Sequence, residues 1–413
     1  MLMTSTAQLH SADRNHPLAF RMAAIAFMNQ NISVACVFGS FSVLLSAVET
    51  RLGIGRELST LAIPLVSLAT AVFAPVTGML ATRYSLRLLM LAGAVLSVAG
   101  FALLSVTASY PLYLVTYGLL LGPGMAVGAI LPATLVTRWY TAHRGRALGI
   151  VYTPIVIALM PPAATWVLQS YGLSATYAML AILSVVTVIC ALFVVDHPPS
   201  VASASTPGAE AGGHAAPAKP ARSMVELLRT PRFWLLTFAF VASITGSIIL
   251  TTQLVPMAES WGLPAELGAT LLSVQSSVGI AGPFLFGWVA DRLGGAMALA
   301  VVALDAALLW ALLILHPTFA GTAVIVALIG LHGAAAVPVL GVALSEGFGR
   351  ESFSRAYGLV NLLNLPFAVL CVPAAALVFS RTGSYAGALM GQAAFLGLTG
   401  VLLFSVLRRY RKA

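Results

Sequence analysis

Twelve long apolar runs, separated by short polar turns, divide this chain of 413 residues. A helix needs about 20 apolar residues to cross the hydrocarbon core of a bilayer, and each run reaches that length. Barrel strands are excluded, because they alternate in polarity over about ten residues whereas these runs are continuously apolar. We therefore predict an all-α membrane protein with twelve transmembrane helices. The predicted spans are 22–48, 58–81, 88–107, 111–137, 147–169, 174–195, 233–257, 266–290, 296–315, 320–345, 356–380 and 385–407.

Composition agrees with this fold class. Hydrophobic residues make up 60% of the chain and charged residues 8%, whereas a soluble domain carries about 25% charged residues. The net charge of +9 lies in short clusters between the apolar runs. It forms no basic stripe interleaved with aromatic residues, which excludes a nucleic-acid partner. The predicted partners are the lipid bilayer, a small-molecule substrate and a proton, and we expect the chain to be a monomer.

A segment rich in Pro, Ala, Gly and Ser separates the sixth span from the seventh. Its sequence, HPPSVASASTPGAEAGGHAAPAKPARS, is too poor in large apolar residues to build a core. We predict a flexible cytoplasmic linker at 196–231. It divides the chain into an N-terminal six-helix bundle, 1–195, and a C-terminal six-helix bundle, 232–413.

The two halves repeat each other at a constant offset. GMLATR at 78–83 matches GWVADR at 287–292, and RALGI at 146–150 matches RAYGL at 355–359, both 209 residues apart. Parallel repeats of this kind are related by an axis along the membrane normal. The predicted architecture is therefore two bundles with pseudo-two-fold symmetry.

The distribution of Lys and Arg predicts the orientation. With both termini in the cytoplasm, the inside segments hold 18 of these residues and the outside segments hold 3. Such an excess marks the cytoplasmic side. We predict a multi-pass protein of the inner or plasma membrane, with both termini cytoplasmic.

Several of the turns between the spans resemble motifs of a known transporter family. GMLATRYSLR and GWVADRLGG resemble the signature loop of the major facilitator superfamily, and the second copy keeps its aspartate, Asp291. The turn RWYTAHRGRALGI, with LLRTPRFW and LVPMAESWGL around the seventh span, resembles the monocarboxylate and oxalate–formate branch. The resemblance implies a secondary active transporter that works by alternating access, not an enzyme. It also implies proton coupling.

Three positions depart from that branch. Relatives that carry small carboxylates use an arginine in span eight, a lysine in span eleven and a tyrosine in span four. Aligning the motifs places Pro283, Asn364 and Ala129 at those positions. Because these changes remove groups that would hold a compact anion, they argue against a dianion such as oxalate. The prediction is a relatively apolar monocarboxylate.

Polar side chains within the spans are the candidate substrate contacts, since polar groups are costly in a bilayer. Asn29, Gln30 and Asn31 are consecutive, so at most two of them share a cavity face. The alternative role for such amides is an interhelical hydrogen bond, about 0.6 kcal/mol each. The predicted substrate-binding residues are Asn29, Asn31, Tyr152, Gln253, Gln275, His332, Asn361 and Asn364.

Two ionisable side chains in the C-terminal half are candidates for proton coupling. His332 lies midway along span ten, and imidazole titrates near neutral pH. The alternative is a hydrogen-bonded packing histidine. Asp305 lies near the middle of span nine, and no Lys or Arg within a span neutralises it. We expect Asp305 to be protonated or hydrogen-bonded and to matter mainly for folding. Proton transfer is the alternative role.

Charged residues at the cytoplasmic turns are candidates for a conformational latch. Charge-assisted hydrogen bonds between these loops can form in one conformation and break in the other. The predicted latch residues are Arg83, Arg144, Arg146, Asp291, Arg292 and Arg355.

Other motifs carry no chemistry. GPGMAVG at 122–128 follows no strand and lies within a predicted span, so its glycines indicate close helix packing and not dinucleotide binding. Cys36, Cys190 and Cys371 are isolated within apolar runs. We find no catalytic set, P-loop or metal-spaced cluster, and predict no cofactor and no metal.

Two other functions remain open at this point. One is transport or efflux of a neutral or zwitterionic hydrophobic compound, because the spans lack fixed cations. The other is a non-transporting membrane receptor of the same fold.

Overall fold

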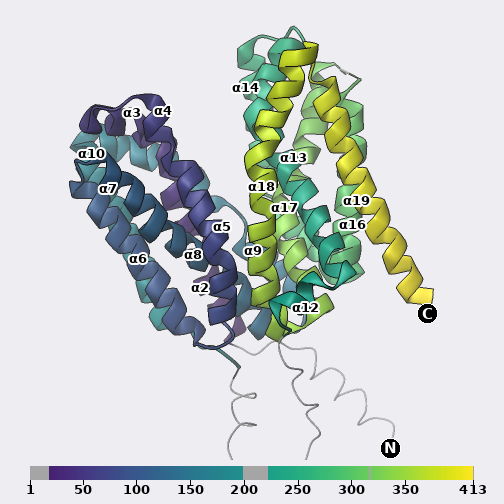
Figure 1. Ribbon diagram of the computed structural model, residues 1–413, viewed down its shortest axis with the longest axis horizontal. Helices are drawn as coiled ribbons and strands as arrows, with labels where there is room; N and C mark the ends of the chain where they lie inside the picture. Colours follow the sequence, from purple (N-terminus) through teal and green to yellow (C-terminus); the bar gives the residue numbers. More distant parts are fainter. Residues whose placement is uncertain (1–17, 199–221, 316–317, 413) are drawn as a thin grey trace, which may run out of the picture. The chain divides into compact units, whose positions relative to one another are not determined.

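The computed structural model describes residues 18–198, 222–315 and 318–412, and within these ranges every regular element is a helix (Figure 1). The helices in chain order are α2 (Ala19–Val34), η1 (Ala35–Gly39), α3 (Ser40–Leu52), α4 (Arg56–Thr60), α5 (Ala62–Leu80), α6 (Leu86–Val106), α7 (Tyr110–Val115), η2 (Thr116–Leu121), α8 (Gly122–Trp139), α9 (Arg144–Val151), α10 (Ile155–Leu192), α12 (Met224–Leu228), α13 (Pro231–Ser260), α14 (Ala265–Gly279), α15 (Gly282–Leu293), α16 (Gly295–Leu313), α17 (Phe319–Phe348), α18 (Arg350–Thr382) and α19 (Ala386–Lys412).

These helices account for twelve spans in the described residues. Ten helical stretches are long and apolar enough to cross a membrane, and α14 with α15 forms one more across a bend of 44°. One of the ten stretches contains two spans, because Gly172, with φ of 81°, breaks the long helix α10. Only glycine adopts such a backbone conformation without strain. Each predicted span lies on its own helical segment, and the predicted fold class is confirmed.

Contacts between helices divide the chain into two compact units. Unit 1 comprises 1–147, 154–223 and 348–362, and unit 2 comprises 148–153, 224–347 and 363–413. Each unit thus includes a short segment from the other half of the sequence: 348–362, which begins α18, in unit 1, and 148–153 in unit 2. The predicted division at the linker stays a prediction.

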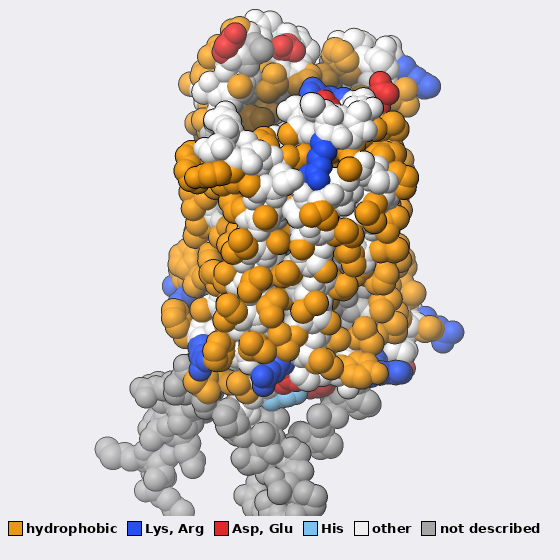
Figure 2. All heavy atoms as spheres, turned by 90° about the vertical axis from the view of Figure 1, so that its left-hand side faces the viewer, with side chains coloured by type: hydrophobic (Ala, Val, Ile, Leu, Met, Phe, Trp, Pro, Cys, Tyr) orange, Lys and Arg blue, Asp and Glu red, His pale blue; other side chains and the backbone are white. Residues whose placement is uncertain are grey.

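Each unit has its own apolar core. In unit 1, Ile32, Phe101 and Leu180 belong to one buried cluster, and α10 packs on both α2 and α6. In unit 2, Trp310 and Leu250 are buried in a cluster built from α13, α16, α17 and α19. Large apolar side chains also cover the surface, where water would disfavour them. Figure 2 shows them as a broad belt on the visible face, with the charged side chains toward its two ends.

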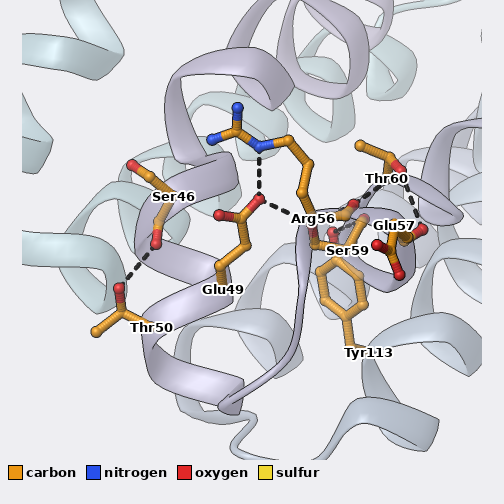
Figure 3. A network of polar contacts seen from close by, with 8 residues as sticks. All are labelled: Ser46, Glu49, Thr50, Arg56, Glu57, Ser59, Thr60 and Tyr113. Atoms are coloured by element: carbon orange, nitrogen blue, oxygen red, sulfur yellow. Dashed lines mark hydrogen bonds and ion pairs between the residues drawn. The ribbon is translucent and has the colours of Figure 1, made fainter.

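A polar corner closes one end of unit 1. Gly53 ends α3 in the left-handed conformation, and the chain turns at once into α4. Glu49 then accepts hydrogen bonds from Arg56 Nε at 3.1 Å and from the Ser59 hydroxyl at 3.2 Å. The Tyr113 hydroxyl donates to the Ser59 carbonyl at 3.3 Å, as Figure 3 shows from close by. The corner therefore joins the first, second and fourth spans.

The described ends of the predicted linker are part of the folded structure. The Asp196 carboxylate accepts hydrogen bonds from the backbone N–H groups of Leu86 and Arg87, at 3.1 and 3.2 Å, where α6 begins. At the other end, the Arg222 N–H donates to the Ser352 hydroxyl at 2.9 Å. Most of the predicted flexible segment, 199–221, lies outside the described residues.

Replacing Asp196 with alanine is expected to destabilise unit 1. The first N–H groups of α6 would lose a charged acceptor placed at the positive end of the helix dipole, which costs about 1–2 kcal/mol. Thermal unfolding of the purified protein measures this change. Glu57→Ala, which removes an exposed acid from α4, is the control. Equal melting temperatures for the two variants would contradict a capping role for Asp196.

Candidate substrate and proton sites

The amide cluster of the first span separates into two roles. Asn31 Oδ1 accepts from the N–H groups of Ile155 and Val156, at 3.1 and 3.3 Å, so it caps the start of α10. Asn29 is also buried, but its Oδ1 makes no hydrogen bond within the described residues and faces Gly128 of α8. Asn29 therefore has an acceptor available for a ligand, while that of Asn31 is engaged in structure.

The π-helical segment η1 lies further along the first span, at Ala35–Gly39, and a second one, η2, lies in the fourth span at Thr116–Leu121. Single π-helical turns in membrane or soluble helices are frequent at functional sites. Both belong to unit 1, and η1 begins six residues after Asn29 on the same span.

Unit 2 contains two comparable amides. Gln275 on α14 is buried and donates from Nε2 to the Thr251 hydroxyl at 3.1 Å, while its Oε1 makes no hydrogen bond in the described structure. Asn364 on α18 is half-buried, and its Oδ1 is likewise unbonded among the residues described. Because a side-chain amide offers both a donor and an acceptor, each can bind a neutral or an anionic oxygen group without carrying charge.

Two of the other predicted substrate contacts form hydrogen bonds within the protein, and the third lies between two helices. Gln253 accepts from the Tyr385 hydroxyl at 3.0 Å, which joins α13 to the start of α19. Asn361 donates to the Tyr357 carbonyl of its own helix at 2.8 Å. Tyr152 is half-buried in the segment between α9 and α10, which belongs to unit 2.

The structure brings the two candidate proton carriers together. His332 on α17 and Asp305 on α16 are 27 residues apart in sequence, yet His332 Nε2 lies 2.7 Å from Asp305 Oδ2. The His332 side chain is 5% exposed and packs against the Phe286 ring of α15, at a centroid distance of 4.8 Å. The Asp305 side chain is 53% exposed, on a face of α16 that also presents Leu308.

The hydrogen bonds of His332 determine where its protons lie. Its Nδ1 contacts the Leu328 carbonyl, which can only accept, so Nδ1 carries a hydrogen. Nε2 is then the ring nitrogen that faces the Asp305 carboxyl, 2.7 Å from Oδ2, although the geometry is not that of a hydrogen bond. The two side chains are thus a candidate pair for binding a proton.

Two glycines allow unusually close helix crossings, one in each unit. A Cβ on Gly358 of α18 would lie 2.9 Å from the Ala74 carbonyl carbon and 3.0 Å from Pro75 Cα, on α5. A Cβ on Gly149 of α9 would lie 2.8 Å from the Pro283 carbonyl carbon and 2.9 Å from Phe284 Cα, on α15. Each residue of one crossing has its counterpart in the other at the offset of 209 residues found in the loops. Gly149 corresponds to Gly358, and Ala74 and Pro75 correspond to Pro283 and Phe284. The repeat therefore extends to individual backbone contacts.

The candidate latch residues lie near these crossings. Arg355 donates to the Thr82 hydroxyl at 2.8 Å and to the Arg222 carbonyl at 3.1 Å, and Ser354 donates to the Gly78 carbonyl at 3.0 Å, all within unit 1. Thr82 stands 209 residues before Asp291, at the equivalent position of the first repeat. In the first repeat a neutral hydroxyl therefore accepts the hydrogen bond from the guanidinium.

The remaining latch candidates are placed as follows. Arg144 donates to the Tyr140 carbonyl at 3.2 Å, and burial raises the pKa of the Tyr140 phenol. Arg292 stacks over the Trp288 ring at 3.9 Å. Arg83 is exposed, and Arg146 and Asp291 are half-buried.

Known proteins resemble this chain in fold and in sequence. The sequence profile of the Major Facilitator Superfamily matches residues 23–365. The chain belongs to the major facilitator superfamily. It is a multi-pass membrane transporter that handles small molecules, and not an enzyme.

Individual relatives are identical to this transporter at about a quarter of the aligned residues. Monocarboxylate transporter 13 of Bos taurus is 26% identical over 335 residues, covering 80% of this chain and 76% of that protein. The oxalate:formate antiporter of Oxalobacter formigenes is 25% identical over 266 residues, covering 64% of this chain and 61% of that protein. These relatives fall in the branch that the sequence resembles.

Solved structures agree on the fold. The Escherichia coli fucose:proton symporter FucP superposes with a TM-score of 0.73 at 14% identity, covering 94% of this chain and 98% of that one. The proton:xylose symporter XylE superposes with a TM-score of 0.71 at 11% identity, covering 95% of this chain and 96% of that one. At such identities the likeness concerns the fold alone.

Several residues of this transporter have roles in the structure that were not predicted from the sequence. Gly149 and Gly358 were present in the repeated RALG and RAYG motifs, so the constant offset could have singled them out. Asp196 gave no signal, because an acid at the start of a linker usually faces solvent. The contact between Thr82 and Arg355 could not be predicted without the positions of α5 and α18.

Proposed function

We propose that this transporter moves a relatively apolar monocarboxylate across the membrane together with a proton, by alternating access. The observation that carries the proposal is the contact between His332 Nε2 and Asp305 Oδ2, at 2.7 Å, in a half of the chain whose spans have no central Lys or Arg. The names of the relatives, monocarboxylate transporter and oxalate:formate antiporter, support the substrate class.

Uncharged amides support a monocarboxylate over a dianion. The oxygens of Asn29, Gln275 and Asn364 are buried and unbonded among the described residues. An amide can accept from the hydroxyl of a protonated acid or, rotated, donate to a carboxylate. Without a fixed cation, each additional negative charge on the substrate would be desolvated at a cost of several kcal/mol, about 2.5–3.5 at the centre of a helix. A single carboxyl group that travels with a proton avoids that cost.

Orientation and gating complete the proposal. The Lys and Arg asymmetry supports an orientation with both termini in the cytoplasm, and we infer that the protein works as a monomer in the inner or plasma membrane. We assign the latch to Asp291 and to the arginines of the cytoplasmic turns. Their hydrogen bonds would form when the crossings at Gly149 and Gly358 are closed and break when they open.

Reconstituted vesicles with an imposed pH gradient test this function. We expect accumulation of an aromatic or branched monocarboxylate such as benzoate on the alkaline side, in excess of flux into protein-free vesicles. Oxalate should not accumulate. Gradient-driven movement of neutral aromatic compounds without acid transport would favour the second function, and no movement of either class would favour a receptor.

Replacing Asn364 with leucine is expected to weaken binding of the acid by up to about tenfold, because one neutral hydrogen bond contributes about 0.5–1.5 kcal/mol. Calorimetric titration of the purified protein with benzoate measures the change. Asn361→Leu on the same helix is the matched control, since its amide is already bonded to the Tyr357 carbonyl. Equal losses in the two variants would contradict a direct role for Asn364.

A further inference from the structure

An apolar groove lies between three helices of unit 2. It has a volume of about 500 Å³ and is lined by α13 from Thr245 to Ile249, by α18 from Pro366 to Val378, and by α19 from Gly387 to Phe395. Figure 1 shows these helices within the same bundle. Its volume is within the range of sites that hold small molecules, about 300–1,000 Å³.

The groove is built by small residues and not by loose packing of α19. On the groove side, a Cβ on Gly391 would meet no atom within 4 Å. On its other side α19 is held tightly, since a Cβ on Gly400 would lie 2.8 Å from the Leu304 side chain of α16. Gln392 also donates to the Ala242 carbonyl of α13 at 2.7 Å. The space beside Gly391 is therefore a defined feature of the bundle.

The polar groups in the groove wall are already bonded. The Thr245 hydroxyl donates to the Val241 carbonyl of its own helix at 2.9 Å, and the amide of Gln392 is engaged as described. The remaining lining side chains are apolar, apart from the weakly polar thiol of Cys371. A cavity with such walls gives water too few hydrogen-bond partners, whereas a hydrocarbon chain fits it.

A cation stands at one end of the groove. Arg381 lies in the last turn of α18 and is exposed. It follows the lining residue Ala374 by seven residues, which is nearly two full turns, so both lie on the same face of the helix about 10 Å apart along its axis. The groove thus extends from an apolar interior toward a positive charge at the end of the span.

We propose that this groove binds one acyl chain of a membrane phospholipid whose anionic headgroup contacts Arg381. A phospholipid is the occupant that combines a hydrocarbon chain with a negative group at the membrane surface, and Leu370 and Leu377 beside the groove are exposed apolar side chains suited to a lipid environment. Anionic headgroups are attracted to Lys and Arg at the membrane surface. This site is separate from the proposed transport of an acid and does not depend on it.

Photo-crosslinking of the full chain in lipid vesicles tests the site. The vesicles contain phosphatidylcholine with a small fraction of phosphatidylglycerol that carries a diazirine on its acyl chain, and labelled peptides are identified by mass spectrometry. We expect labels on the groove-lining parts of α18 and α19. Ala374→Phe should reduce them about tenfold by filling the groove, while Ala376→Phe, an exposed position on the same helix outside the lining, should leave them unchanged.

Further variants distinguish the parts of the proposal. Arg381→Gln should lower labelling by the phosphatidylglycerol probe about fivefold relative to a phosphatidylcholine probe with the same chain. Gly391→Leu fills the groove from α19 and replaces Ala374→Phe if that variant does not fold. Labelling that survives both filling substitutions overturns the proposal. So does labelling of the groove by a diazirine fatty acid but not by the phospholipid, which would indicate a site for free acids.

Discussion

Gly358→Ala is expected to shift the conformational equilibrium of the transporter away from the state described here by about 5- to 150-fold. The added methyl group would overlap α5 at Ala74 and Pro75. The overlapped atoms belong to the backbone, which cannot move aside as a flexible side chain could. Overpacking of this kind costs about 1–3 kcal/mol, and the whole cost falls on the conformation in which α5 and α18 cross. The same change at Gly149, against Pro283 of α15, should act in the same direction.

A buried serine beside the crossing reports the shift. Ser354 is 2% exposed and hydrogen-bonded to the Gly78 carbonyl, so a thiol at this position is protected while the crossing is closed. In a background without Cys36, Cys190 and Cys371, we expect the Ser354→Cys thiol to react faster with a soluble maleimide when Gly358→Ala is added. The increase should match the shift in equilibrium.

A second glycine provides the matched control for this experiment. A Cβ on Gly397 of α19 would lie 3.7 Å from the Ala307 side chain, an ordinary contact distance. Gly397→Ala should therefore leave thiol reactivity unchanged and stabilise its helix by up to about 1 kcal/mol. If Gly358→Ala and Gly397→Ala behave alike, the crossing is not a point at which the conformations differ.

The sequence was sufficient to predict the spans and the repeat, because both depend on local information. A run of about 20 apolar residues specifies a membrane helix wherever it packs, and the offset between GMLATR and GWVADR survives as a sequence match. The crossing glycines belong to the same repeat. Their role stayed hidden because a glycine in a membrane helix has many possible neighbours.

Pairings between side chains were beyond sequence reasoning. Asn29 and Asn31 are equivalent in the sequence, and only the position of α10 makes Asn31 a capping residue. Likewise, the orientation of α16 and α17 about their own axes decides whether Asp305 meets His332. A rotation of one helix by a single residue, about 100°, would separate them. The expectation that Asp305 matters mainly for folding rested on treating it alone.

The pairing leads to a sharper expectation for both residues. Because the two side chains are in contact, His332→Gln and Asp305→Asn should each abolish accumulation driven by a pH gradient. With two independent sites, each single variant would instead keep part of the accumulation and only the double variant would lose all of it. Uptake of benzoate into reconstituted vesicles measures the effect. Ser243→Ala, a buried hydroxyl of α13 bonded within its own helix, is the control and should keep the gradient response.

Stability should distinguish the two single variants. In His332→Gln, Asp305 has lost its basic partner and must either keep its own proton or place a charge within the bilayer. Folding should therefore weaken by up to about 2.5–3.5 kcal/mol, the cost of a charge at the centre of a membrane helix. Asp305→Asn leaves the imidazole beside a neutral amide and should lose only about 0.6 kcal/mol, the value of one interhelical hydrogen bond.

The double variant decides between a shared proton and two separate groups. Adding Asp305→Asn to His332→Gln removes the carboxyl group that loses its partner, so the double variant should be more stable than His332→Gln alone. Thermal unfolding of the purified variants measures this rescue. Without rescue, the carboxyl group of Asp305 is tolerated by itself and the two side chains do not hold a common proton.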